Sequence, residues 1–383
     1  MVSLSSLKII VTTTMAKPLY AKCRRFFPDL PEHIFRNLLL VCAAITLARS
    51  TNLNVLKDYM PQLLANEQTK ADSHYKRLIR FFRIPTPNRL VICILQFVFR
   101  LFQSRITHLI LDATTWRVGQ KPIHLLTLCM LYRDTAIPIY WRQLPKKGHS
   151  SEIERQQLMT EALRYYRLRG KILLADREYI GEKWLRYLYL EGIDFVIRLS
   201  EGCYKLPISQ AAGPTYSKLT RQAHHRKRGV IKEFVLNGCP FSIVMLKNPK
   251  NDPAEPLLYF ISSLSHKVKI TEAYRRRWRI ETCFKHLKTQ GFNIEDLNFK
   301  NDGKIMLLIA IVVMAYVLSL KEAFENGTLK QKIYRNGSRS MSVSFFRQGI
   351  TCLRRHVQSL AQFIRYLESI AQTLLTPQWM YVQ

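Results

Sequence analysis

The chain has 383 residues, 48 % of them hydrophobic and 22 % charged, which excludes a disordered protein and predicts two or three structural units. Its 59 Lys and Arg residues outnumber 27 Asp and Glu residues, for a formal net charge of +32. Because like charge repels itself in a compact fold, we expect a polyanionic partner, and nucleic acid is the natural candidate. A ribosomal or membrane-surface protein fits less well, since the basic residues are spread along a chain with clear core segments.

The first hundred residues are expected to form a helical domain. Apolar periodicity predicts helices over residues 31–49, 54–64 and 73–83, with Ser73 as the N-cap of the third. That third helix carries a row of cations: Lys76, Arg77, Arg80 and Arg83. A short basic helix after two others is compatible with a helix-turn-helix that recognises DNA, and the simpler interpretation is a basic helix face in solvent.

From residue 106 the pattern changes to strands that alternate with helices. Three strands, a helix, a strand, a helix and a strand are predicted over residues 106–112, 124–132, 137–141, 151–167, 171–176, 182–189 and 194–199. A turn at Arg133 and Asp134 joins the second and third strands, and Ser151 with Glu154 forms a capping box that opens the first helix. This order predicts an RNase H-like α/β core.

A β-rich insertion is expected over residues 201–265, before the helix at about 271–289 that would complete this core. It contains strand-like runs at 234–236, 241–246 and 257–262, and a basic segment at 221–228 that is expected to be a loop. We therefore predict a helical DNA-binding domain over 1–100, a catalytic core over 101–200 and 266–325, the insertion between them, and C-terminal helices over 326–383.

No membrane attachment is expected. The apolar run over residues 305–320 is shorter than the roughly 20 residues that a membrane span requires, so a buried core helix is predicted there. The first 14 residues lack the basic start and cleavage site of a signal peptide, and Met15 is an alternative start. Eight scattered cysteines without a CxxC pair predict neither a zinc site nor a disulfide framework, so we expect a cytoplasmic protein associated with the nucleoid.

Two aspartates each follow an apolar strand-like run. Asp112 follows Leu-Ile-Leu and Asp176 follows Ile-Leu-Leu-Ala, positions at which an aspartate is costly unless it is paired or bound to metal. Neighbouring strands of an RNase H-like sheet would bring the two together, and Glu281 on the following helix would add a third oxygen ligand. Oxygen-only ligation suits Mg²⁺ or Mn²⁺, and two such ions support phosphodiester cleavage and strand transfer.

The helix at 271–289 places polar residues at steps of three, four and seven: Tyr274, Arg277, Glu281 and Lys288. At about 100° per residue these side chains are predicted to project within roughly 60° of one another. An ordinary amphipathic helix with an Arg–Glu pair four residues apart is the alternative interpretation of this helix taken alone.

The spacing Tyr-x2-Arg-x3-Glu-x6-Lys resembles the Y-R-E-K signature of the insertion-sequence-four (IS-four) family of DDE transposases. The segment Asp176-Arg177-Glu178 is similar to the second-aspartate motif of that family, and the β-rich insertion is also typical of it. The resemblance covers about residues 106–320. It implies a DNA transposase that cuts at the terminal inverted repeats of its element and transfers the strand into target DNA, as a homodimer in a synaptic complex.

The resemblance also implies roles for individual residues. Asp112, Asp176 and Glu281 would be the catalytic residues and would hold the metal, with Mg²⁺ as the cofactor and Mn²⁺ as a substitute. It also implies DNA contacts by Tyr274, Arg277, Trp278 and Lys288. Apart from the resemblance, further DNA contacts are expected from the basic residues Arg177, Arg226, Lys227, Arg228, Lys76, Arg77 and Arg80. Some members of the family cut through a DNA hairpin and stack a flipped base on a tryptophan in the insertion. Tyr259 or Phe260 could fill that position here, since stacking needs only an aromatic face. Whether this protein uses a hairpin step therefore stays open.

Three functions stay open from the residues alone. The leading hypothesis is the transposase. The others are a cellular RNase H-like nuclease that moves no element, and a domesticated or inactive DNA-binding protein. His224 and His225 are expected to be phosphate contacts or solvated residues rather than metal ligands, and the C-terminal helix over 345–375 could contact DNA or a second subunit.

Overall fold

The computed structural model describes residues 26–28, 30–102, 106–119, 121–199, 216–225, 230–236, 238–249, 252–297, 299–327, 331–333, 337, 339–341 and 343–375. The chain divides into two compact units. The first unit combines residues 1–101, 117–122 and 285–383, and the second combines residues 102–116 and 123–284. N-terminal and C-terminal segments therefore share one unit, whereas the sequence suggested that each forms a region of its own.

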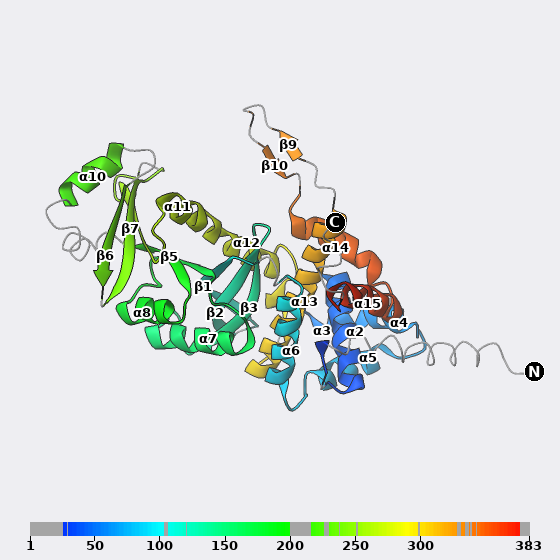
Figure 1. Cartoon of the computed structure of the whole chain (residues 1–383). Coiled ribbons are helices and arrows are strands. Elements are labelled where there is room, and N and C mark those ends of the chain that lie inside the picture. The colour runs from blue at the N-terminus through cyan, green and yellow to red at the C-terminus, as the bar shows by residue number, and fades with distance from the viewer. Residues whose placement is uncertain are drawn as a thin grey trace, which may run out of the picture. The chain divides into compact units, whose positions relative to one another are not determined.

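The second unit is built on an eight-stranded, mostly antiparallel sheet with the order β3-β2-β1-β4-β5-β8-β7-β6 (Figure 1). The strands are β1 (His108–Val118), β2 (Lys121–Tyr132), β3 (Thr135–Leu144), β4 (Ile172–Ala175), β5 (Asp194–Leu199), β6 (Val230–Leu236), β7 (Cys239–Lys247) and β8 (Leu257–Ser262). β4 pairs in parallel with both β1 and β5. The first five strands in this order, with their connecting helices, confirm the predicted RNase H-like core.

Helices cover both faces of this sheet. In Figure 1, α7 (Glu152–Tyr165) and α8 (Glu182–Leu190) lie along one side, and α11 (Lys267–Arg275) and α12 (Arg279–Leu287) lie along the other. Ser151 caps α7 in a reciprocal capping box with Glu154, as predicted. The turn between β2 and β3 has positive φ at both Arg133 and Asp134, which matches the twist of a tight hairpin.

The predicted insertion extends the same sheet and forms no separate sheet in the described residues. β8 pairs antiparallel with β5, and β7 and β6 follow it outward. The strands were predicted, but the loop expected over 221–228 was partly wrong, because α10 (Tyr216–His225) is helical through His225. Its remaining positions, Arg226, Lys227 and Arg228, lie outside the described residues.

The first unit is a helical assembly. Its described helices are α2 (Glu32–Ala48), α3 (Leu53–Leu56), η2 (Lys57–Tyr59), α4 (Met60–Leu64), α5 (Ala71–Phe81), α6 (Pro87–Arg100), η6 (Ile294–Asp296), α13 (Asp302–Asn326), α14 (Phe345–His356) and α15 (Leu360–Leu375), beside a short hairpin of β9 (Gln331–Ile333) and β10 (Arg339–Met341). The N-cap predicted at Ser73 was wrong. α5 begins two residues earlier at Ala71, a strong helix former, and Lys70 is its N-cap residue.

The central helix α13 packs against α2, α6 and α14. It is the one helix in the described part of the chain that is long and apolar enough to cross a membrane alone, and 83 % of its most apolar window is buried in the protein. Contact with α14 depends on Gly349, where an added Cβ would lie 1.7 Å from the carbonyl oxygen of Ser319. The single helix predicted over 345–375 is two helices, since the chain turns at residues 357–359.

Candidate active site

The pairing of β1 with β4 sets Asp112 beside Asp176. The parallel register ends with Leu111 opposite Ala175, so the next residue of each segment is an aspartate at the same edge of the pairing. The prediction that Asp112 ends its strand was wrong, because β1 continues to Val118. The β-branched residues after Asp112 favour this extension. Only the buried, parallel-paired part of β1 ends at Leu111.

Glu281 joins these aspartates through Arg277. The guanidinium of Arg277 lies 3.6 Å from Asp112 Oδ2, 3.5 Å from Asp176 Oδ2 and 3.2 Å from Glu281 Oε1, measured from its terminal nitrogens. The Arg277 side chain is only 11 % exposed. Three carboxylates from separate segments of the chain therefore converge on one buried cation.

The segment that carries Arg277 and Glu281 differs from the predicted continuous helix over 271–289. α11 ends at Arg275, a 3₁₀ turn η5 (Arg276–Trp278) follows, and α12 begins at Arg279. The tighter turn changes the angular steps that an ideal α-helix would give. Tyr274, Arg277 and Glu281 nevertheless reach the same cluster, because each contacts a neighbouring member of it.

Tyr274 contacts both the Asp176 carboxylate and the sheet. Its hydroxyl donates to Asp176 Oδ1 at 3.2 Å, and its ring lies 4.7 Å from that of Phe260, between centroids. Burial and the nearby Asp176 carboxylate raise the pKa of Tyr274, so the phenol stays protonated and remains a donor. Phe260 and Tyr259 are both buried, so neither offers the exposed ring that stacking on a flipped base would require.

Tyr179 is a part of the cluster that sequence reasoning missed. Its fully buried hydroxyl donates to Asp112 Oδ1 at 3.2 Å. Burial, Asp112 and Glu178 raise the pKa of Tyr179, which keeps this phenol protonated as well. The only signal in the sequence was its position directly after Asp176-Arg177-Glu178. Glu178 itself pairs with His149 Nδ1 at 2.7 Å.

Burial raises the pKa of Asp112 to about 6, although Arg277 and the backbone N–H of Ala113 oppose the rise. For Arg277, burial lowers the pKa, but Tyr274 and the carboxylates outweigh it and raise the pKa overall. Arg277 is therefore a permanent cation among acidic groups. The electrostatics of the cluster favour positive charge at its centre.

The donor set of the cluster suits a hard divalent cation. Among the described residues, no group of three His, Cys, Asp or Glu side chains forms a metal site as it stands. The guanidinium of Arg277 lies among the three carboxylates, in the space between their oxygens. All three donors are oxygens, and the position between them already accepts positive charge. The carboxylates of Asp112, Asp176 and Glu281 therefore suit Mg²⁺ or Mn²⁺, provided that the Arg277 guanidinium moves partly out of the space between them.

The other predicted contacts are distributed more widely. Trp278 is 55 % exposed, Arg177 is exposed, and both belong to the second unit. Lys288 belongs to the first unit, where its Nζ lies 3.8 Å from Glu295 Oε1. His224 and His225 are exposed at the end of α10.

The comparison with protein families matches residues 103–318 to the transposase DDE domain family, which is more than half of the chain. The chain belongs to the DDE transposases. It is therefore placed among enzymes that cleave and join DNA strands, and among proteins that generally depend on a divalent metal. No curated protein matches the chain.

A solved structure, the cryo-EM structure of the piggyBac transposase synaptic complex with hairpin DNA, is similar at 13 % identity and a TM-score of 0.44. The similarity covers 92 % of this chain and 78 % of that one.

Proposed function

We propose that this DDE transposase cuts DNA at the terminal inverted repeats of its own element and joins the freed end to target DNA. The observation that carries the proposal is the convergence of Asp112, Asp176 and Glu281 on Arg277. Three half-buried carboxylates gathered around one cation repel one another at a cost to stability, so a function is the best explanation for their retention. The net charge of +32 suits a polyanionic substrate.

Asp112, Asp176 and Glu281 would hold Mg²⁺, or Mn²⁺ in its place. When bound, two such ions activate the attacking water or 3′-hydroxyl and stabilise the leaving oxygen. Around them, Tyr274 fixes Asp176 and Tyr179 fixes Asp112 through hydroxyl hydrogen bonds. These bonds hold the carboxylate oxygens toward the cluster centre before DNA arrives.

Further residues would bind the DNA strand. With the three carboxylates engaged by metal, Arg277 would be available to a phosphate next to the cut and Tyr274 to a neighbouring one, and Lys288 would also contact the DNA backbone. Trp278 offers an exposed ring to a base at the element end. These roles are the ones that the resemblance to the Y-R-E-K signature implies. With them we propose that the chain belongs to the IS-four family.

Two features of the reaction follow from its chemistry. Joining two element ends requires two active sites, so a homodimer in a synaptic complex is the expected assembly. The reaction takes place on DNA, so we expect a cytoplasmic protein that associates with the nucleoid. A hairpin step would need an exposed stacking ring, and Trp278, which is exposed and follows Arg277 in the chain, is our candidate.

The test is cleavage of a plasmid that carries the gene with its flanking DNA, in the presence of Mg²⁺. Asp112→Ala, Asp176→Ala and Glu281→Ala should each lower the cleavage rate by at least about 10³-fold, because a metal ligand acts in the transition state. Glu161→Gln is the matched control, since it removes a carboxylate of the same unit that pairs with Arg142 instead. The control should cleave at the wild-type rate.

Each alternative function has its own outcome in this assay. Cutting at sites unrelated to the flanking DNA would favour a cellular nuclease. Binding to the flanking DNA without metal-dependent cutting would favour a domesticated or inactive DNA-binding protein. Full activity in any one alanine variant would remove that residue from the catalytic set.

A further inference from the structure

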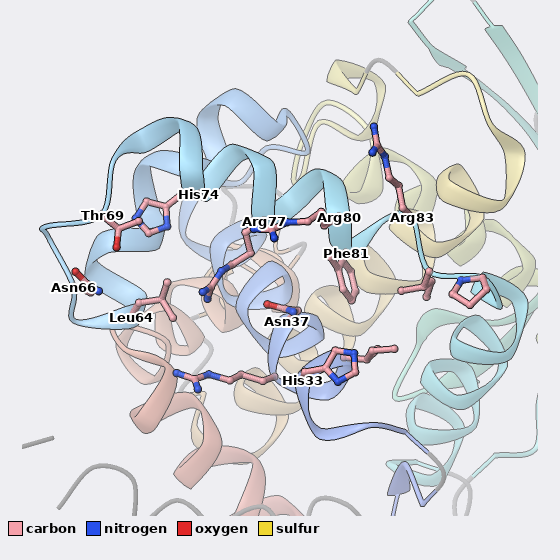
Figure 2. Close-up of a pocket in the computed structure, with 14 residues that line it drawn as sticks. His33, Asn37, Leu64, Asn66, Thr69, His74, Arg77, Arg80, Phe81 and Arg83 are labelled. Atoms are coloured by element: carbon pink, nitrogen blue, oxygen red, sulfur yellow. The ribbon is translucent and has the colours of Figure 1, made fainter. Parts of the chain in front are cut away.

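The first unit contains a basic pocket of about 740 Å³ between α2 and α5 (Figure 2). Its lining includes four arginines: Arg36 of α2, Arg77 and Arg80 of α5, and Arg83 just beyond it. The pocket's volume is that of a typical small-ligand site, and amide and hydroxyl groups of Asn37, Asn66 and Thr69 also face it. The lining is therefore rich in hydrogen-bond donors.

Among the described residues, no acidic side chain compensates the positive charge of this pocket. Burial lowers the pKa of Arg77, and Arg36 and Arg80 lower it further by repulsion. No carboxylate of the described residues lies within ion-pair distance of Arg36, Arg77, Arg80 or Arg83. Cations are held together at a cost to stability, which an anionic ligand would relieve.

A buried histidine in the same wall has one ring nitrogen without a hydrogen-bond partner among the described residues. His74 is 2 % exposed, and within the described chain its Nε2 has no hydrogen-bond partner. Figure 2 shows Arg77 extending from α5 toward α2, where Asn37 faces the same space. Arg77 is half-buried, whereas Lys76 on the same helix is exposed and does not line the pocket. The cations of α5 thus belong to two different surfaces.

We propose that this pocket binds a phosphate group of the duplex DNA backbone, with Arg36 and Arg77 as its main ligands. The proposal rests on the proposed function, which supplies the DNA. Two guanidinium groups provide the planar donor pairs that phosphate oxygens accept, and the pocket wall adds amide donors. The contact carries no base information, so this site anchors the DNA and does not select its sequence.

The experiment measures duplex DNA binding by the full chain as a function of salt. A double variant, Arg36→Ala with Arg77→Ala, should weaken binding about eightfold at 0.1 M salt and reduce the slope of log K against log [salt] by about 1, because one phosphate contact contributes a slope of roughly −0.9. The loss should be equal for the flanking DNA and for random duplexes. Lys70→Ala, an exposed cation that does not line the pocket, is the matched control.

A second measurement separates binding from folding. Because Arg36 and Arg77 repel each other, the double variant should melt at or above the wild-type temperature, whereas residues with a structural role would lower it. Inorganic phosphate should raise the melting temperature of the wild-type chain and leave that of the double variant unchanged.

Three outcomes would overturn the proposal. If the double variant binds DNA with unchanged affinity and an unchanged salt slope, the pocket does not bind DNA. This conclusion holds even if the wild-type pocket binds inorganic phosphate. A loss confined to the flanking sequence would indicate base recognition instead. A loss equal to that of Lys70→Ala would indicate general surface charge. Cleavage by the wild-type chain is measured in a separate assay. Failure of the catalytic proposal would therefore appear as missing cleavage, and failure of the pocket proposal as unchanged DNA binding in the double variant.

Discussion

His286 is a buried base whose protonation the fold opposes. Its ring packs against Phe346 at 4.7 Å and Tyr316 at 6.0 Å, between ring centroids, and its Nδ1 has no hydrogen-bond partner among the described residues. Burial lowers the pKa of His286 from 6.5 to about 4. The folded protein therefore binds fewer protons at this site than the unfolded chain between these two values.

This difference predicts how stability depends on pH. A depressed folded pKa gives stability that is complete above pH 6.5 and is lost as pH falls toward 4. The whole shift corresponds to about 3 kcal/mol at 1.36 kcal/mol per pKa unit, and about 2 kcal/mol of it is lost between pH 7 and pH 5. The protein should unfold at lower urea concentration at pH 5.

The His286→Phe variant isolates this contribution. Phenylalanine keeps a planar ring among Phe346 and Tyr316 and removes both the titration and the unpartnered nitrogen. Urea unfolding at pH 7 and pH 5, followed by circular dichroism, should show a fall in the free energy of unfolding that is smaller by about 2 kcal/mol in the variant. Other titrating groups cancel in this comparison. An equal pH dependence in both proteins would refute the reasoning.

Other predictions address packing, capping and charge. Gly349→Ala should destabilise the protein by more than about 3 kcal/mol, since the new Cβ meets backbone at Ser319, and a thermal melt equal to wild type would contradict this. Ser151→Ala should cost about 1 kcal/mol through loss of the α7 capping box, seen as a melting point lower by a few degrees; an unchanged melt would argue against the cap. Arg277→Ala should lower stability by about 3 kcal/mol in a metal chelator, and Mg²⁺ should restore part of it; no loss in chelator would show that the carboxylates do not depend on Arg277.

Local features of the fold were predictable because they depend on neighbouring residues. Ser151 and Glu154 are three positions apart, and the turn at Arg133 and Asp134 separates two β-rich runs. The order of elements in an RNase H-like core predicted that β1 and β4 are neighbours, and the observed register places Asp112 beside Asp176. Periodicity and fold topology together were enough for these residues.

The unpredicted features depend on contacts between residues far apart in the sequence. Tyr179 reaches Asp112 across 67 positions, and no local pattern marks its hydroxyl as a hydrogen-bond donor to that carboxylate. The 3₁₀ turn η5 interrupts the helix that periodicity predicted over 271–289, although Arg277 and Glu281 still pair four residues apart. The extension of the sheet by β8 depends on β5 offering a free edge, which the sequence of neither strand reveals.

The central claim is that Asp112, Asp176 and Glu281 hold the metal that cuts DNA. A Glu281→Cys substitution tests it most directly, because a thiolate is a poor ligand for Mg²⁺ and a better one for softer divalent ions. Cleavage of the flanking DNA by this variant should be lost in Mg²⁺ and should return in part when Mn²⁺ replaces it. Wild-type cleavage in Mg²⁺, or no recovery with Mn²⁺ in a folded variant that still binds DNA, would contradict the account.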